Sequence, residues 1–387
     1  MKIKNLKIKK FNDFLNKIYT QYQDSPDICI LKQVDSVKDL KGPLHIAWEI
    51  TSDCNFKCIH CRAADNDSKL HKTSKFSLDE YKQVIDNMAE LQLYTLGITG
   101  GEPFTHPHIF EIIDYCKSKK LNLIIYTNAS LIDDKTAKFL SGVLDANDIM
   151  HVSLDGAIKE DNDKQRGQGT FERIINGIEC LARHNVPLRL TIVPTTSNIE
   201  HITDIVDIAK KYNIKEISAV PLMNAGRAKD KNLMPEPTKL FDKEIEMIDK
   251  LEKNAPNIIY RGGIFGPVCF YKKVPGVCSA ENFIKRKGNL RRICDAGTRQ
   301  LFVDSNGNVY PCHLFASSID FAIGNVFKTR IEDLWKSKKL TIFKEGIEME
   351  KCSCLNCELW DLCNGGCMGL SWINNKTLTS PDPRCNK

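Results

Sequence analysis

Six strand-forming stretches alternate with helical stretches between residues 44 and 220, and this alternation constrains the fold more than any other feature. It is typical of a parallel sheet whose strands are joined by helical crossovers. The pattern supplies no seventh or eighth unit after residue 220, so a closed eight-unit barrel is not expected. The sequence predicts an α/β fold with a partial, open (β/α)6 barrel. The expected strands are residues 44–50, 95–99, 121–127, 149–155, 186–193 and 214–220.

The first crossover helix carries the clearest start signal. Ser77 stands before a run of helix formers and Glu80 follows three residues later, which is the pattern of a capping box. The remaining crossovers follow their strands at regular spacing. The expected helices are residues 77–91, 109–120, 133–142, 170–185 and 198–213.

The rest of the chain lacks this alternation. Residues 1–43 are a lysine-rich lead-in with one short helix expected near residues 9–22, and 44–221 form the barrel. Prolines interrupt residues 222–290, which we interpret as a bridging segment with a charged helix near 236–253. Residues 291–387 are short, turn-rich and dense in cysteine, and predict a small α+β domain. Its residues 299–312 predict a β-hairpin that turns at Asn306-Gly307.

Composition excludes several functional classes. A formal charge of +6 and a pI near 8.5 are well short of a nucleic-acid-binding footprint. No apolar run is long enough to span a bilayer, and the N-terminus has no signal-peptide pattern. Sixteen cysteines could form disulfides in a secreted protein. Without a secretion signal, a reduced, cytoplasmic protein with metal-binding cysteines is the preferred interpretation.

Three cysteines follow the first expected strand directly. Cys54, Cys58 and Cys61 are separated by three and two residues, in the sequence CNFKCIHC. Three thiolates can hold three irons of a [4Fe–4S] cubane and leave the fourth iron open to a ligand. A structural zinc ion is the alternative, but a closed zinc site needs a fourth ligand that is not nearby.

This loop resembles the signature of the radical S-adenosylmethionine superfamily, whose fold is a partial TIM-like barrel. The resemblance continues along the chain with Gly100, Gly101 and Glu102, which the family places around the methionine amino group. A single polar residue at a cofactor position could instead be a helix cap or a turn former. The polar residues of this resemblance, however, follow the ends of the expected strands. The other cofactor contacts that the resemblance implies are His60 beside the adenine, Asn128 after the third strand, Ser153 and Asp155 at the ribose and carboxylate, and Arg166 at the carboxylate.

The C-terminal cysteines resemble the SPASM domain, which carries auxiliary iron–sulfur clusters in peptide-modifying radical enzymes. The resemblance implies two auxiliary clusters, expected to be [4Fe–4S]. One is assigned to Cys354, Cys357, Cys363 and Cys385, and the other to Cys294, Cys312 and Cys367. Cys278 is the candidate for its fourth ligand, with Cys269 as a second candidate. Two structural zinc sites remain an alternative for the paired cysteines. The cysteines expected to lie outside the clusters are Cys29, Cys116, Cys180 and Cys352.

His313 follows Cys312, where related sulfatase-maturating enzymes have an aspartate that acts as a base. A histidine can accept a proton near neutral pH, so His313 is the candidate catalytic residue. A structural role is the alternative. The substitution argues against formylglycine formation as the reaction.

The resemblance implies an oxidoreductase-type enzyme that cleaves S-adenosylmethionine reductively. The resulting 5′-deoxyadenosyl radical would take hydrogen from a substrate. The leading hypothesis is oxidative modification or cross-linking of a ribosomally made peptide, as in a peptide maturase. The alternatives are oxidation or decarboxylation of a porphyrin in haem synthesis and, in another class, an iron–sulfur electron carrier or scaffold.

The same resemblance implies several partners. A low-potential donor such as a flavodoxin or ferredoxin would supply the electron, and a precursor peptide or a small molecule would be the substrate. Only about 43 residues precede the first expected strand. Because that is short for a separate peptide-recognition domain, a peptide-presenting partner is a further expectation. No nucleic acid and no membrane are expected as partners.

Overall fold

The chain folds around one sheet of ten strands, in the order β11-β10-β9-β1-β2-β3-β4-β5-β6-β7. The computed structural model describes residues 7, 9–10, 13, 40–62, 76–91, 93–229, 231–262, 291–292, 294–348, 354, 357 and 365–385. The six predicted barrel strands are present and pair in parallel in chain order. They are β1 (His45–Thr51), β2 (Thr95–Gly100), β3 (Leu123–Thr127), β4 (Ile149–Ser153), β5 (Leu188–Ile192) and β6 (Glu216–Ala219).

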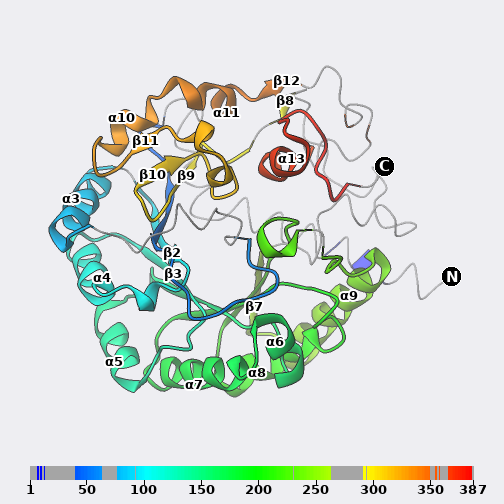
Figure 1. Ribbon diagram of the computed structural model, residues 1–387. Helices are drawn as coiled ribbons and strands as arrows, with labels where there is room; N and C mark the ends of the chain where they lie inside the picture. Colours follow the sequence, from blue (N-terminus) through cyan, green and yellow to red (C-terminus); the bar gives the residue numbers. More distant parts are fainter. Residues whose placement is uncertain are drawn as a thin grey trace.

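Helices cover the outer face of the barrel strands as an arc in Figure 1. The capping box at the start of the first of them is present, because Glu80 N donates to Ser77 Oγ and the Glu80 carboxylate accepts from Ser77 N. The helices of the arc are α3 (Leu78–Ala89), α4 (Ile109–Ser118), α5 (Asp134–Val143), α6 (Lys159–Arg166), α7 (Thr170–Arg183) and α8 (Ile205–Lys211). Short 3-10 turns at η3 (Pro103–Thr105) and η4 (Ile202–Asp204) link some of these elements.

The sheet extends past the six predicted strands at both edges. On one edge, α9 (Pro237–Asn254) leads into β7 (Ile259–Gly262), which pairs in parallel with β6. This strand is short and follows Pro256 closely, which hid a seventh unit from the sequence pattern. On the other edge, β9 (Gln300–Val303) pairs in parallel with β1. The hairpin region therefore shares the sheet of the barrel.

The predicted hairpin is confirmed, because β9 pairs antiparallel with β10 (Asn308–Tyr310). Asp304 organises its turn by accepting hydrogen bonds from the backbone N–H groups of Asn306 and Asn308, at 2.9 and 2.8 Å. Gly307 has φ +81°, and a Cβ there would lie 2.4 Å from the Phe327 ring, so only glycine fits. The remaining elements are η5 (Gly226–Ala228), β8 (Arg291–Arg292), η8 (Phe315–Ser317), η9 (Ile319–Phe321), β11 (Gly324–Asn325), α10 (Ile331–Trp335), η10 (Lys338–Leu340), α11 (Thr341–Glu345), β12 (Ile347–Glu348) and α13 (Met368–Asn375).

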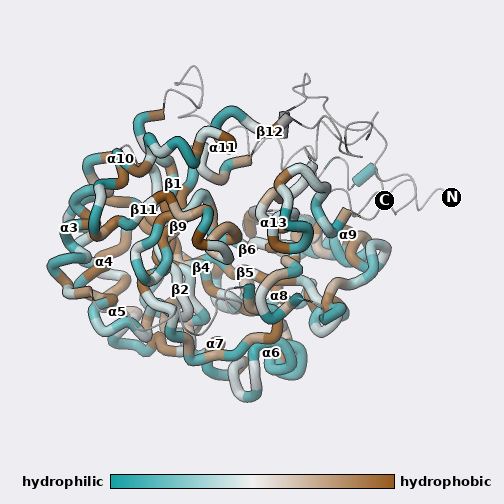
Figure 2. The backbone as a smooth tube through the Cα atoms, turned by 45° about the horizontal axis from the view of Figure 1, so that its top comes forward, coloured by the Kyte–Doolittle hydropathy of each residue, from teal (hydrophilic) through white to brown (hydrophobic). Residues whose placement is uncertain are grey.

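The barrel has an apolar outer layer and a polar inner one. Alternate strand residues such as Ile46 and Trp48 are buried against the helices, and Figure 2 shows this apolar centre inside a hydrophilic exterior. Polar side chains occupy the opposite, inner face. His151 Nε2 lies 2.8 Å from Arg189, which pairs with Glu216. Closed eight-unit barrels fill their interior with branched apolar residues, whereas this open barrel retains a polar interior next to its functional edge.

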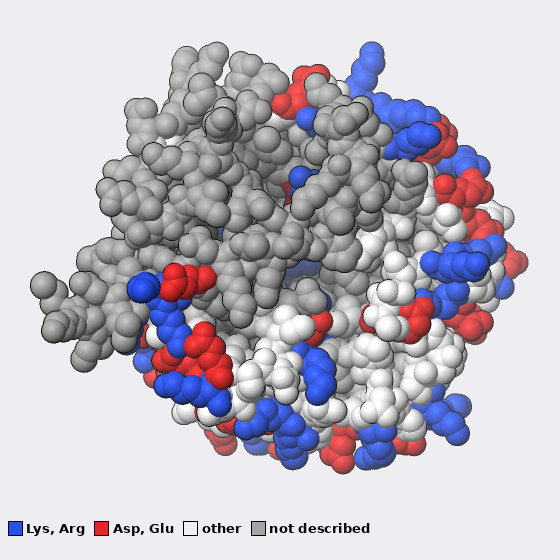
Figure 3. Space-filling model, turned by 180° about the vertical axis from the view of Figure 1, so that it is seen from behind, with Lys and Arg blue, Asp and Glu red and all other residues white. Residues whose placement is uncertain are grey.

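The surface carries charges of both signs close together. On the face seen in Figure 3, Lys and Arg are interspersed with Asp and Glu where side chains are described. Lys250 on α9, for example, contacts Asp204 and Asp207 at 2.7 and 2.8 Å. None of the helices in the described ranges is long and apolar enough to cross a membrane.

Candidate active site

The loop that carries Cys54, Cys58 and Cys61 leaves the carboxyl end of β1 and is fixed there by the end of β2. Gly101 N donates to Thr51 O at 2.8 Å, and Glu102 N donates to Asp53 O at 2.7 Å. A Cβ on Gly101 would lie 2.1 Å from the Asp53 carbonyl oxygen. The glycines of the GGE sequence are therefore required by the close approach of two backbone segments.

The other side of the cysteine loop is held by residues that the sequence analysis did not identify. Ile59 N donates to Gln165 O at 2.9 Å. Arg227 donates from its backbone N to Cys61 O at 2.8 Å and from Nε to Cys58 O at 2.7 Å. Gly226 has φ +61°, and a Cβ there would lie 2.2 Å from Cys61 O. The sequence does contain one signal for this contact. Gly226 and Arg227 follow the sixth strand closely, at the same edge of the sheet as the cysteines.

The three thiols lie close enough to influence one another electrostatically. The pKa of Cys54 is raised to about 11, mainly by desolvation, and the nearby Glu102, Cys58 and Cys61 side chains contribute to the rise. Burial also raises the pKa of Cys58, against the lowering effect of Arg166 and Arg227. Such thiols become thiolates readily only when a metal binds them. Among the described residues, no three His, Cys, Asp or Glu side chains are arranged to hold a single metal ion. A cubane distributes its thiolates over different irons, so this loop fits a cluster.

His60, Asp155 and Arg166 form a buried group beside the cysteine loop. The Asp155 Oδ2 atom lies 2.6 Å from Arg166 and 3.2 Å from His60 Nε2, while Oδ1 accepts a hydrogen bond from Val193 N. Burial lowers the pKa of His60 to about 4, so its ring is neutral at pH 7. His60 Nδ1 and Arg166 Nε are buried, and neither has a hydrogen-bond partner within the described part of the chain. Buried polar atoms normally have a hydrogen-bond partner, so a polar cofactor bound here could supply the partners of both nitrogen atoms.

Glu102 connects two strand ends inside the protein. Its carboxylate accepts hydrogen bonds from Thr127 Oγ1 at 2.6 Å, Asn128 N at 2.7 Å and Phe104 N at 3.3 Å. Burial nevertheless raises the pKa of Glu102 to about 6. The Asn128 side chain is also engaged, because its Nδ2 donates to Asn55 Oδ1 at 3.0 Å. Both predicted cofactor residues therefore hold the site together through their own hydrogen bonds.

Two further hydroxyl groups near this edge have no hydrogen-bond partner among the described residues. They are Ser52 Oγ, next to the cysteine loop, and Thr191 Oγ1 on β5, and both atoms are buried. Thr191 is in register with the predicted residue Ser153 on β4. The sequence analysis missed both, because a single Ser or Thr in a strand or loop carries no distinctive spacing.

In the C-terminal region, Cys312 lies near Cys294 and Cys367. The pKa of Cys312 is raised by burial and by these two neighbouring thiols. The structure thus brings together three cysteines that the sequence assigned to one auxiliary cluster. Asp382, missed by the sequence analysis, accepts a hydrogen bond from Cys367 N at 2.8 Å and lies 2.8 Å from Arg384.

Three cysteines of the other predicted cluster are described. Cys357 N donates to Cys354 O at 2.9 Å, and Cys385 N donates to Asp382 O at 2.8 Å. Cys116 is buried in the core on α4, and Cys180 on α7 is partly buried, as expected of packing residues. The remaining cysteines, which lie outside the described residues, are Cys29, Cys269, Cys278, Cys352 and Cys363.

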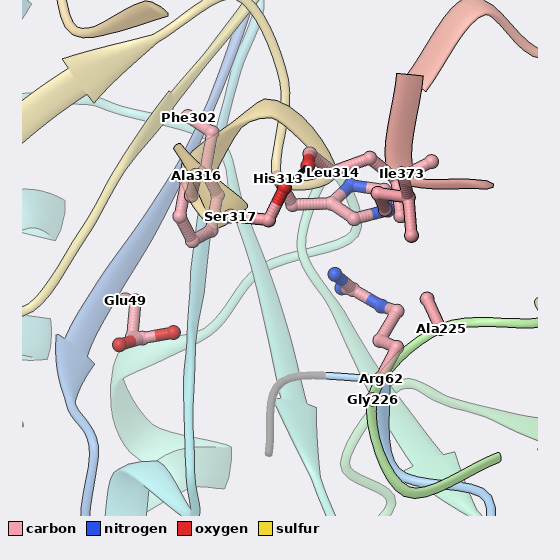
Figure 4. A pocket seen from close by; sticks show the side chains of 10 residues that line it. All are labelled: Glu49, Arg62, Ala225, Gly226, Phe302, His313, Leu314, Ala316, Ser317 and Ile373. Carbon is pink, nitrogen blue, oxygen red and sulfur yellow. Dashed lines mark hydrogen bonds between the residues drawn. The ribbon is translucent and has the colours of Figure 1, made fainter. Parts of the chain in front are cut away.

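A pocket lies between the barrel and the C-terminal region (Figure 4). His313 contributes to it, with its ring 6.3 Å from that of Phe302, and burial holds the pKa of His313 well below its usual range. Across the pocket, burial and the nearby Asp304 carboxylate raise the pKa of Glu49 to about 7. The lining residues are Glu49, Arg62, Ala225, Gly226, Phe302, His313, Leu314, Ala316, Ser317 and Ile373.

Curated relatives cover most of this chain. Mycofactocin maturase MftC of Mycobacterium tuberculosis is 28% identical over 353 residues, which are 90% of this chain and 84% of that one. An AdoMet-dependent heme synthase of Methanosarcina barkeri is 28% identical over 89% of this chain and 96% of its own. The subtilosin biosynthesis protein AlbA of Bacillus subtilis is 27% identical over 76% of this chain and 60% of its own.

Solved structures share the fold. SuiB of Streptococcus suis superposes with a TM-score of 0.73 at 20% identity, covering 93% of this chain and 80% of its own. The enzyme anSMEcpe, solved with AdoMet and a peptide, gives 0.66 at 19% identity and covers 89% of this chain and 94% of its own. At these identities the likeness shows the fold alone.

Two family models match the regions described above. The Radical SAM superfamily model matches residues 48–217, which contain the cysteine loop, the GGE sequence and the His60 group. The SPASM iron–sulfur cluster-binding domain matches residues 294–358. S-adenosylmethionine, a [4Fe–4S] cluster and auxiliary iron–sulfur clusters are therefore its cofactors. The chain belongs to the radical SAM superfamily, as an enzyme with a C-terminal SPASM domain.

Proposed function

We propose that this enzyme oxidatively modifies or cross-links a ribosomally made peptide, starting from removal of a hydrogen atom. The observation that carries the proposal is the position of the pocket that Glu49 and His313 help to line. This pocket lies between the cysteine loop after β1 and the turn that follows Cys312. A substrate in that pocket would contact the radical-generating side and the auxiliary side at once. The names of the relatives support a peptide, since two of them are maturation or biosynthesis proteins for peptide products.

In this proposal the residues of the chain have separate roles. Cys54, Cys58 and Cys61 hold the cluster that, once reduced, supplies the electron for cleaving S-adenosylmethionine. Neutral His60 and the Arg166–Asp155 pair orient the cofactor through the unsatisfied His60 Nδ1 and Arg166 Nε atoms.

Two auxiliary clusters and an external electron donor complete the proposed enzyme. Cys294, Cys312 and Cys367 hold one auxiliary cluster, and Cys354, Cys357, Cys363 and Cys385 hold the other. A low-potential flavodoxin- or ferredoxin-like protein supplies the electron, and the enzyme works in a reducing cytoplasm, where its cysteines stay available to iron.

The test uses anaerobically reconstituted enzyme with S-adenosylmethionine and dithionite. Short peptides encoded near its gene are added one at a time, and products are analysed by mass spectrometry. The expected result is 5′-deoxyadenosine together with a peptide that has lost hydrogen. A porphyrin is the second candidate substrate, because a heme synthase aligns along 96% of its length. Conversion of iron coproporphyrin, with every peptide unchanged, would replace the peptide proposal with that one.

A further inference from the structure

Arg62 directly follows the third cysteine of the loop and lines the pocket. Within the described residues it makes no hydrogen bond and no ion pair, and its side chain is exposed to the pocket. Figure 4 shows its guanidinium group directed from the cysteine loop toward the side of the pocket that carries His313. A guanidinium stays charged at every physiological pH, so this pocket always contains a positive charge.

The other described arginines around the site all have protein partners. Arg166 contacts Asp155 at 2.6 Å, Arg227 donates to Cys58 O at 2.7 Å, and Arg384 contacts Asp382 at 2.8 Å. These three stabilise the loops that carry the cysteines. Arg62 makes no comparable contact with the residues that the structure describes, so its donors are available to a ligand.

The walls of the pocket favour an anionic ligand. Phe302, Leu314 and Ile373 present apolar surface, and Ala225 and Gly226 leave space beside the guanidinium. A charge beside apolar walls is poorly solvated and gains strongly from an opposite charge. Glu49 is the acid of the pocket, and Figure 4 shows its carboxylate apart from the Arg62 guanidinium, with which it forms no ion pair. It therefore does not take the place of a bound anion.

The position of Arg62 also points to the substrate. Its guanidinium is close enough to both Cys61 and Cys312 for each thiol to influence its pKa. The residue thus lies between the radical-generating loop and a cysteine of the SPASM domain. A substrate group bound to Arg62 would therefore lie between the cysteine loop that generates the radical and the auxiliary cluster proposed to accept the electron.

We propose that the pocket is a substrate subsite for a carboxylate, and that Arg62 binds the two carboxylate oxygens. The planar guanidinium matches a carboxylate with two parallel hydrogen bonds. The inference rests on the proposed function, under which the carboxylate belongs to a peptide, as an acidic side chain or a terminal group. A porphyrin propionate offers the same chemistry, and the experiment separates the two sources.

The first measurement is chemical labelling of Arg62 in anaerobic holoenzyme. Phenylglyoxal modifies accessible, unpaired arginines, and the modified residue is identified by mass spectrometry. Glutarate, a simple dicarboxylate, is expected to slow labelling of Arg62 roughly threefold when about two thirds of the sites are occupied. Glutaramide, its uncharged diamide, is expected to give no protection. Equal labelling with and without saturating glutarate would overturn the subsite.

The source of the carboxylate is tested in the same assay. A peptide that the enzyme modifies is compared with its analogue in which every carboxylate is an amide, and with coproporphyrin. Protection by the acidic peptide alone supports the full proposal. Protection by coproporphyrin but by no peptide keeps the subsite and overturns the peptide function. Equal protection by the acidic and amidated peptides overturns the subsite and leaves the peptide function intact.

The second measurement is steady-state kinetics of Arg62→Gln, with Arg62→Lys as the conservative variant. For the modified substrate, KM is expected to rise roughly ten- to a hundred-fold in Arg62→Gln, and less in Arg62→Lys, with kcat retained. Lys57→Gln is the matched control, because Lys57 is an exposed cation on the same loop outside the pocket. Iron content is measured in each variant. An unchanged KM in an iron-replete Arg62→Gln protein contradicts the assignment.

Discussion

The two cysteine regions of this enzyme are stabilised in different ways. The loop with Cys54, Cys58 and Cys61 receives backbone hydrogen bonds from the end of β2, from Gln165 and from Arg227. In the described part of the C-terminal region, Cys357 N donates to Cys354 O, and Asp382 accepts hydrogen bonds from Cys385 N and Cys367 N. We expect the barrel to shape the radical site without its metal, and the SPASM domain to depend more on the clusters it binds.

The largest expected effect comes from replacing Cys54, Cys58 and Cys61 together by alanine. This change removes the ligands of one cluster, so about one third of the iron and all 5′-deoxyadenosine formation should disappear. Because the loop backbone is held by its neighbours, the thermal unfolding midpoint should stay close to that of the unmodified protein. Iron analysis, product chromatography and circular dichroism check this. A large drop in the midpoint would show that the radical cluster also holds the barrel together.

Cys357→Ala, in contrast, is expected to destabilise the C-terminal region of the protein. We expect loss of an auxiliary cluster and rapid proteolysis in the region after residue 294, while the barrel fragment resists. Limited proteolysis with mass spectrometry locates the cleavage sites. If the variant remains folded, it should still form 5′-deoxyadenosine but little modified substrate. A folded variant with normal product formation would remove the proposed electron-accepting role.

Glycine substitutions test how tightly the cysteine loop is held. Gly101→Ala should cost about 2 kcal/mol or more of unfolding free energy, because the new Cβ would lie 2.1 Å from Asp53 O. The matched control is Gly142→Ala, since Gly142 lies within α5 and has no atom within 4 Å of a Cβ. The control should gain roughly 0.5–1 kcal/mol from helix propensity. Denaturant unfolding of both variants gives the comparison, and equal effects would contradict the tight packing.

These contacts also show what the sequence could and could not predict. The order of β1 to β6, the capping box of Ser77 and the hairpin at Gly307 follow from local patterns, and the structure confirms them. The sequence could not show that β9 would join β1, because this pairing connects residues about 255 positions apart. Nor could it show that Glu102 hydrogen-bonds within the protein, since a carboxylate in a motif looks the same whether it binds a ligand or a backbone.

Arg166→Ala is expected to weaken S-adenosylmethionine binding roughly ten- to a hundred-fold, with iron content unchanged. The substitution removes Nε and leaves the buried Asp155 carboxylate without its partner at 2.6 Å. Isothermal titration with anaerobic protein measures the affinity. Arg183→Ala serves as the control, because Arg183 is exposed on α7 and pairs with the surface carboxylates of Asp134 and Glu179. Unaltered affinity would assign Arg166 a purely structural role.

The smallest expected effect is a pH dependence that arises from Glu49. Its pKa is raised to about 7, first by burial and then by Asp304, while Ser305 and Arg62 act in the opposite direction. Tyr310 is near enough for Glu49 to raise its pKa, and it stays neutral in this range. Below pH 7 Glu49 is protonated and the pocket keeps the positive charge of Arg62. Above pH 7 Glu49 is ionised and opposes a bound carboxylate.

KM for a carboxylate substrate should therefore rise about fivefold between pH 6 and pH 8, which corresponds to about 1 kcal/mol for one partly screened charge. Glu49→Gln should remove this rise, because an amide does not titrate. The same pKa implies that ionising Glu49 disfavours folding, so stability should fall as pH increases from 4.5 toward 7 and then level off. Kinetics at several pH values in both proteins test the first point, and urea unfolding tests the second. A KM that rises equally in Glu49→Gln would assign the titration to another group and separate the pocket acid from substrate binding.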